Sequence, residues 1–227
     1  MVFTSIKLRQ LEIILKLPTS VNVLNTNSNL NMLNFDIVLA SASPRRKAIL
    51  SQVHQNFIIQ PSNINEDFTI ELLPKAFCEY WSSKKAKSIA ESHSDKLVIG
   101  ADTIVVNDDK ILGKPKNQRE SFAMLESLSG KTHKVLTGVS LIHLELGIDY
   151  TFNESTDVTF CTLSNDDIRD YVDKYKPYDK AGSYGIQDGF SVYVKRINGC
   201  FYNVMGFPIS RFHKFYKMIK EEGRLID

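Results

Sequence analysis

Cysteine is scarce in this sequence and shows no pairing pattern. The 227 residues include three cysteines, Cys78, Cys161 and Cys200, which lie far apart and lack a CxxC spacing. An odd number of distant cysteines argues against a disulfide framework and against a structural zinc site. The pattern favours a reducing compartment, so we expect a cytoplasmic protein.

Excess charge and long apolar runs are missing as well. The chain has 28 basic and 26 acidic side chains, a formal net charge of +2. This gives no basic field for binding nucleic acid through its phosphates. No apolar run approaches the ~18 residues that cross a bilayer. We therefore expect no stable nucleic-acid partner and no membrane partner, in a chain whose 43% hydrophobic content is typical of a folded protein.

Several catalytic signatures are absent too. The five histidines show no HxxxH or HExxH spacing, which argues against a histidine-rich metal site. The chain has neither a GxSxG nucleophile elbow nor a Walker P-loop. The chemistry must therefore be sought in carboxylates, hydroxyls and basic side chains.

The first 34 residues differ from the rest. Three basic residues face one acid, Glu12, and residues 21–34 are dominated by asparagine. Such a segment buries too little apolar surface to fold alone, so residues 1–34 are predicted to be a poorly ordered extension. Its basic, acid-poor composition weakly resembles a transit peptide, which leaves a mitochondrial location as the alternative. Residues 35–227 are predicted to form one domain.

Residues 35–227 alternate between short apolar runs and amphipathic stretches. Strands are expected at 35–40, 56–62, 96–106 and within 132–163, and helices at 44–53, 72–93, 118–130, 164–175 and 208–223. Asp108-Asp109 reads as a turn, and Asn198-Gly199 between two β-rich runs predicts a type I′ hairpin. The interleaving predicts an α/β fold with a mixed, twisted central sheet flanked by helices.

Two motifs point to phosphate chemistry. Ser41 to Arg46, SASPRR, join a buried strand to a helix, where free N–H groups, hydroxyls and guanidinium groups suit phosphate oxygens. The alternative is a helix cap at Ser43 followed by two solvated arginines. Asp102 interrupts the most apolar strand, where an ionised carboxylate is costly unless it is paired or binds metal. We favour a functional Asp102 over a purely structural one.

Two further motifs are weaker alone. Lys114, in LGKP after the expected turn, is either solvated or a point-charge clamp for phosphate. Residues 178–187, YDKAGSYGIQ, hold two glycines that permit close approach to a planar ligand. Gln187 at its end offers a donor and an acceptor together, as reading the edge of a base requires.

Together these segments resemble the Maf family of nucleoside triphosphate pyrophosphatases. The resemblance runs, in order, through LASASPRR, IGADTIVV, LGKPKN, SGKTHKVLTGV, YDKAGSYGIQD and NVMGFPI, and covers nearly everything after Asn34. It implies a mixed α/β fold with a deep nucleotide-binding cleft, similar to that of inosine triphosphatases. It also implies hydrolysis of a nucleoside triphosphate to monophosphate and pyrophosphate with a divalent cation, Mg²⁺ or Mn²⁺. A homodimer is left open.

The resemblance also implies roles for individual residues. Asp102 would be the general base that activates water, and Glu66 would help Asp102 to hold the metal. Four further residues would bind the phosphates: Ser41, Arg46, Lys85 and Lys114.

Subgroups of the family differ at three places, which here are Arg45, Thr103 and Gln187. These residues match the subgroup that hydrolyses dTTP and UTP, whereas the subgroup acting on 7-methyl-GTP carries bulkier or acidic residues. Phe190 and Ser191 depart from the small residues usual after the glycine loop, which bears on the width of the base pocket. The rival hypothesis is a nucleotide- or RNA-binding regulator with little catalysis.

Overall fold

The structure is a computed structural model that describes residues 35–222. The extension predicted over residues 1–34 lies outside the described residues, as does Gly223, which was expected to close the last helix. Within residues 35–222, no helix combines the length and apolarity needed to span a membrane. The three cysteines are free, as the sequence predicts.

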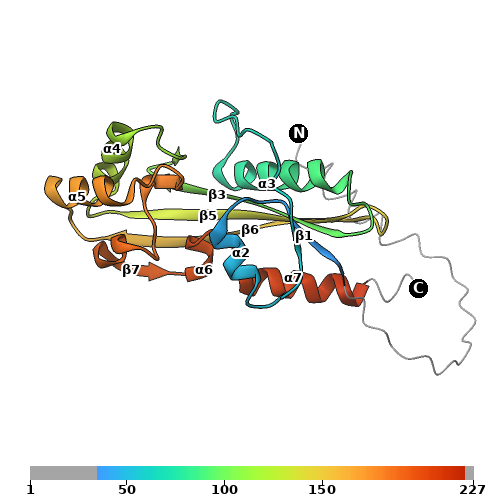
Figure 1. The fold of residues 1–227 in the computed structure, drawn as a ribbon. Helices are drawn as coiled ribbons and strands as arrows, with labels where there is room; N and C mark the ends of the chain where they lie inside the picture. Colours follow the sequence, from blue (N-terminus) through green and yellow to red (C-terminus); the bar gives the residue numbers. More distant parts are fainter. Residues whose placement is uncertain (1–34, 223–227) are drawn as a thin grey trace, which may run out of the picture. The chain divides into compact units, whose positions relative to one another are not determined.

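The domain is built on one mixed sheet of seven strands, which confirms the predicted α/β class (Figure 1). The strand order is β2-β1-β3-β5-β6-β7, and β4 pairs with β3 off this path. The pairs β1–β2 and β1–β3 are parallel, and the others are antiparallel. The strands are β1 (Ile37–Leu39), β2 (Ile58–Ile59), β3 (Leu97–Asn107), β4 (Lys110–Leu112), β5 (Thr132–His143), β6 (Ile148–Phe160) and β7 (Val194–Asn198).

Helices cover both faces of this sheet. In Figure 1, α3 runs along one face of the long strands and α7 lies across the other. The helices are α2 (Pro44–Leu50), α3 (Pro74–Ala90), α4 (Gln118–Leu128), α5 (Asn165–Tyr175), α6 (Phe201–Val204) and α7 (Ile209–Glu222), with short 3₁₀ turns η1 (Ala181–Ser183) and η2 (Gly189–Tyr193).

The core follows from the alternation of side chains along β3. Val98 and Ile104 are buried on the face that α3 covers, whereas Ile99 and Ala101 are buried on the α7 face. Because β3 is apolar on both faces it reads as a continuous hydrophobic run, as buried central strands do. A charged residue within it therefore has to be satisfied locally.

One edge of β3 has a gap, and the candidate site lies there. β1 pairs with residues 97–99 and β4 pairs with residues 105–107 on the same edge. Among the described strands, none pairs with residues 100–104 on that edge. The gap exists because β1 ends at Leu39 and the chain turns into α2, so Asp102 and Thr103 meet the loop from β1 instead of a neighbouring strand.

Most local signals in the sequence are confirmed. Ser43 caps α2, its hydroxyl accepting from the N–H of Arg46 at 3.4 Å. Asp108 and Asp109 form the turn between β3 and β4 with φ angles of 47° and 62°. Ser164 begins α5 with a reciprocal capping box to Asp167.

The predicted type I′ hairpin at Asn198-Gly199 is wrong. β7 ends at Asn198, but the following residues form the short helix α6 and not a returning strand. Asn203, in α6, is fully buried and donates from Nδ2 to the Val135 carbonyl and to the Thr156 hydroxyl. These tertiary contacts with β5 and β6 outweigh the local turn signal, because a buried amide needs partners.

Candidate active site

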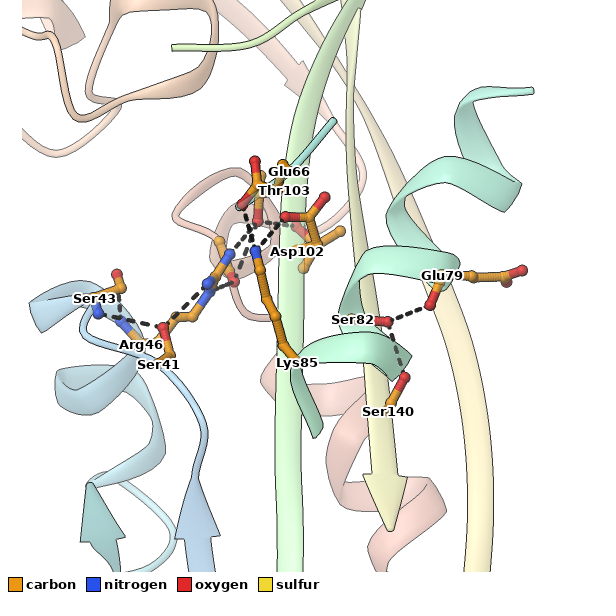
Figure 2. A network of polar contacts seen from close by, with 12 residues as sticks. Ser41, Ser43, Arg46, Glu66, Glu79, Ser82, Lys85, Asp102, Thr103 and Ser140 are labelled. Carbon is orange, nitrogen blue, oxygen red and sulfur yellow. Dashed lines mark hydrogen bonds and ion pairs between the residues drawn. The ribbon is translucent and has the colours of Figure 1, made fainter. Parts of the chain in front are cut away.

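A single cleft gathers every site residue that the sequence predicts. Its volume is about 390 Å³, within the range of small-molecule sites. Nine of the residues that line it are those predicted from the sequence: Ser41, Arg45, Arg46, Glu66, Lys85, Asp102, Thr103, Lys114 and Gln187. Figure 2 shows the centre of this cleft, where side chains from the β1–α2 loop, α2, α3 and β3 converge.

Two glycines let α3 approach the sheet closely enough to deliver Lys85. A β-carbon at Gly100 would clash with the Ser82 carbonyl oxygen, and one at Gly138 would clash with the Cys78 carbonyl oxygen. The helix backbone therefore rests directly on β3 and β5. Gly100 and Asp102 share a face of β3, because side chains two residues apart point the same way. The Asp102 carboxylate consequently meets Lys85 on α3.

Lys85 bridges two carboxylates. Its Nζ donates to Glu66 Oε1 at 2.5 Å and to Asp102 Oδ1 at 2.7 Å. The side chains of Lys85, Glu66 and Asp102 are 11%, 19% and 3% exposed. Burial raises the pKa of Asp102, and the Glu66 charge adds to this against the pull of Lys85. Burial also acts to raise the pKa of Glu66, but Lys85, Lys114 and Asp102 together outweigh it and the pKa is lowered.

Asp102 keeps one oxygen free for chemistry. Its Oδ2 is buried and has no hydrogen-bond partner among the described residues. A buried unpaired carboxylate oxygen is costly, so its presence in a cleft indicates a ligand, a metal or a proton to be moved. This oxygen is the strongest chemical signal in the site.

The same carboxylates fit a hard divalent cation. Within residues 35–222, no cluster of three or more histidine, cysteine or acidic residues is arranged to hold a metal. Mg²⁺, however, is usually held by one or two carboxylates together with substrate phosphates. Glu66 and Asp102 supply those oxygens, including the unpaired Asp102 Oδ2. The residues present therefore fit a cation that arrives with a phosphorylated substrate.

Arg46 approaches the gap from the opposite side (Figure 2). It donates from Nε to the Gly206 carbonyl at 3.0 Å, from Nη1 to Ser41 Oγ at 3.1 Å and from Nη2 to Thr103 Oγ1 at 3.0 Å. All three acceptors are neutral, so the guanidinium charge is held in place without being cancelled by an adjacent carboxylate. Burial lowers the pKa of Arg46, while Asp102 and Glu66 oppose that shift from a distance.

Ser41 completes this side of the cleft. Its Oγ accepts from the Ser43 N–H at 3.2 Å and from Arg46, which fixes the hydroxyl in a buried position. The α2 helix has only seven residues, so its dipole adds little to the attraction that Arg46 exerts on an anion. The expected phosphate cradle thus depends more on the guanidinium and the hydroxyl than on the helix terminus.

Arg45 reaches across the mouth of the cleft. Its Nη1 pairs with Asp179 Oδ2 at 3.1 Å, and the other Asp179 oxygen accepts from Lys180 Nζ at 2.7 Å. Asp179 is 60% exposed and Arg45 is 22% exposed, so water screens this pair. The contact joins α2 to the 178–187 loop.

Comparison with known proteins supplies the deciding observation. The model of the family described as Maf-like protein matches residues 36–221, which include the whole cleft. The chain belongs to the Maf-like protein family. A dTTP/UTP pyrophosphatase of Bacillus mycoides is 46% identical over 175 residues, which cover 77% of this chain and 91% of that protein. One from Carboxydothermus hydrogenoformans is 38% identical over 187 residues, covering 82% and 98% of the two chains.

A third relative is the dTTP/UTP pyrophosphatase of Ruminiclostridium cellulolyticum, which is 40% identical over 188 residues. This alignment covers 82% of this chain and 97% of the relative. Among solved structures, a HAM1 protein from Coxiella burnetii aligns with 56% of this chain and 73% of its own at 16% identity. Its TM-score of 0.43 is too low to carry a fold assignment.

The Maf-like cleft is closed on one side by the loop that carries Gln187. Tyr171 on α5 accepts from the Gly185 N–H at 3.1 Å and donates to Asp188 at 3.2 Å, so it holds the loop on both sides of Gln187. Gln187 itself is exposed in the cleft. Phe190 is buried against the rings of Tyr171 and its neighbours and is absent from the cleft wall, so its size does not narrow the cleft.

Several parts of this Maf-like site give no signal in the local sequence. Asp179 and Lys180 lie in the glycine-loop motif, but nothing local shows that Asp179 pairs with Arg45. Gly206 accepts from Arg46 through its main-chain carbonyl, and a carbonyl carries no signal in its residue type. The only signal in the sequence is the glycine itself, because glycine favours the positive φ, 105°, that the backbone adopts at Gly206.

Proposed function

We propose that the chain is a nucleoside triphosphate pyrophosphatase whose substrates are dTTP and UTP or their modified forms. Water attacks the α-phosphorus, the bond from that phosphorus to the bridging oxygen of the β-phosphate breaks, and the products are the nucleoside monophosphate and pyrophosphate. The observation that carries the proposal is the free, buried Oδ2 of Asp102 beside Lys85 and across a cleft from Arg46.

Asp102 is proposed as the general base. Its pKa is raised by burial, which brings a carboxylate closer to the proton affinity that a base at neutral pH requires. Lys85 holds Oδ1 by a hydrogen bond and leaves Oδ2 to take the proton of the attacking water. Glu66 fixes Lys85 from the other side.

The cationic side chains neutralise the phosphates. Arg46 and Ser41 lie together on one wall and suit the oxygens of the departing pyrophosphate. Lys114 is exposed in the same cleft, and its flexible side chain can bring the ammonium charge to a phosphate oxygen. Stabilising charge on the leaving group is the main requirement of phosphoryl transfer.

Glu66 and Asp102 would hold a Mg²⁺ or Mn²⁺ ion together with the substrate phosphates. When bound, such an ion supplies Lewis-acid stabilisation of phosphate charge.

The base is proposed to lie toward Gln187 and Arg45. The Gln187 amide can accept from the imide N–H of uracil or thymine and donate to an adjacent carbonyl. Thr103 is small and leaves room beside Asp102, while Arg45 can leave the screened pair with Asp179 to contact the ligand. A pocket that pairs with the pyrimidine edge disfavours bases that leave its polar groups unpaired.

A substrate panel tests the proposal. The purified chain is incubated with Mg²⁺ and UTP, dTTP, ATP, GTP or 7-methyl-GTP, and pyrophosphate and orthophosphate are measured separately. We expect pyrophosphate without orthophosphate and the highest kcat/KM for UTP and dTTP. A higher kcat/KM for ATP or 7-methyl-GTP would overturn the base assignment. Tight UTP binding without any cleavage would favour the rival, a nucleotide-binding regulator.

A further inference from the structure

A buried hydroxyl that does not touch the cleft is connected to Arg46. Thr137 on β5 lies directly opposite Thr103 on β3, and the two Oγ1 atoms are 3.0 Å apart. Thr137 is fully buried and does not line the cleft. Its Oγ1 also lies 3.1 Å from the carbonyl oxygen of Asn203 in α6.

The direction of each hydrogen bond that links Arg46, Thr103, Thr137 and Asn203 is fixed by elimination. A carbonyl cannot donate, so Thr137 gives its single proton to Asn203. Thr137 can then only accept from Thr103, whose alternative acceptor, the Gly206 carbonyl, is 3.5 Å away. The Thr103 oxygen in turn accepts from Arg46 Nη2. The order is therefore Arg46 to Thr103 to Thr137 to Asn203.

The last acceptor of this series of hydrogen bonds, Asn203, is anchored in the sheet. Asn203 donates from Nδ2 to Val135 on β5 and to Thr156 on β6, so the final acceptor is fixed. Hydrogen bonds that run in one direction polarise one another, and here a guanidinium stands at the donor end. Without the Thr137 hydroxyl, the Thr103 proton has only Gly206, whose carbonyl already accepts from Arg46 Nε.

We propose that Thr137 is a positioning residue for phosphate binding: its hydroxyl directs the Thr103 lone pair toward Arg46 and so sets the guanidinium for the anion. This rests on the proposed function in that Arg46 is taken to bind phosphate. Thr137 touches neither substrate nor cleft.

The test compares Thr137→Val, Thr137→Ser and wild type in the full chain. Valine keeps the shape and removes the hydroxyl, whereas serine keeps the hydroxyl. The matched control is Ser140→Ala on the same strand, since Ser140 is also buried and bonds to the Ser82 hydroxyl on the other face (Figure 2). Its second partner is the Thr151 hydroxyl. The readouts are the Kd of inorganic pyrophosphate by calorimetry with Mg²⁺, the KM and kcat for UTP, and the melting temperature.

We expect Thr137→Val to weaken pyrophosphate binding by about five- to tenfold, as loss of one hydrogen bond supporting a charged group would, and to raise KM more than it lowers kcat. Thr137→Ser and Ser140→Ala should bind within about twofold of wild type, even where the melting temperature falls. If Thr137→Val does not fold, Thr137→Ala makes the same deletion with less apolar bulk.

Unchanged binding by the valine variant would overturn the proposal, as would an equal loss in the serine variant or in Ser140→Ala. Wild type that binds pyrophosphate but does not cleave UTP would refute the proposed function and leave the Thr137 series decisive. Wild type that cleaves UTP but binds no pyrophosphate would overturn the Thr137 proposal and leave the proposed function standing.

Discussion

Removing the Lys85 charge exposes what holds the centre of the site together. Lys85→Met keeps a long apolar stem but leaves Glu66 and Asp102 facing each other without their cation. Losing one partner of a buried ion pair costs about 3–5 kcal/mol. Glu66 is on a loop and 19% exposed, so it can turn toward water, and the lower figure applies. At roughly 2–4 °C per kcal/mol for a domain of this size, the melting temperature should fall by roughly 6–12 °C.

Two companion variants separate this effect from a general loss of charge. Lys87→Met, on the same helix, removes a pair with Asp149 in which both side chains are about half exposed, so less than ~1 kcal/mol should be lost. The double variant Lys85→Met/Asp102→Asn should regain most of the lost stability, because it neutralises the carboxylate that was left buried. Thermal unfolding by circular dichroism measures all four proteins. A Lys85→Met protein as stable as wild type, or a double variant no better than the single one, would refute this reasoning.

Other variants examine the supports of the site. Burial lowers the pKa of His133 from 6.5 to about 4. Between these pH values only the unfolded chain binds a proton at this histidine. The free energy of unfolding should therefore fall by up to about 3 kcal/mol as the pH drops from 6.5 to 4. His133→Gln should flatten the melting temperature against pH there, and an unchanged slope would contradict this. Gly100→Ala should lower the melting temperature and displace Lys85, costing activity as well; normal values of both would show that α3 can move freely. Gln187→Glu should narrow the preference for UTP over ATP in kcat/KM, because a carboxylate cannot donate; an unaltered ratio would place base reading elsewhere.

Much of the site was predictable because its chemistry conflicts with its surroundings. Asp102 stands in an apolar strand, and a charge there demands a partner, which the structure supplies as Lys85. The strand-to-helix junction at Ser43 and Pro44 follows from capping and fixes the start of α2. The nine predicted cleft residues are together in one place, although their roles in binding and catalysis stay predictions.

The remaining features depend on contacts between distant segments. The Asn198-Gly199 signal is a sound local rule, yet the buried amide of Asn203 and its partners on β5 and β6 place a helix where a strand was expected. The Arg45–Asp179 pair and the Gly206 carbonyl under Arg46 join residues more than a hundred positions apart. Residue type and spacing along the chain contain no information on such pairings.

The isotope distribution after hydrolysis tests the central claim most directly. UTP is cleaved in ¹⁸O-labelled water with Mg²⁺ by wild type and by Asp102→Asn, and the products are weighed by mass spectrometry. We expect label in UMP, unlabelled pyrophosphate, and a rate at least about a hundredfold lower in the variant, on the usual scale of general base catalysis. Label in pyrophosphate or orthophosphate, or an Asp102→Asn enzyme of near-normal rate, would contradict attack at the α-phosphorus with Asp102 as the base.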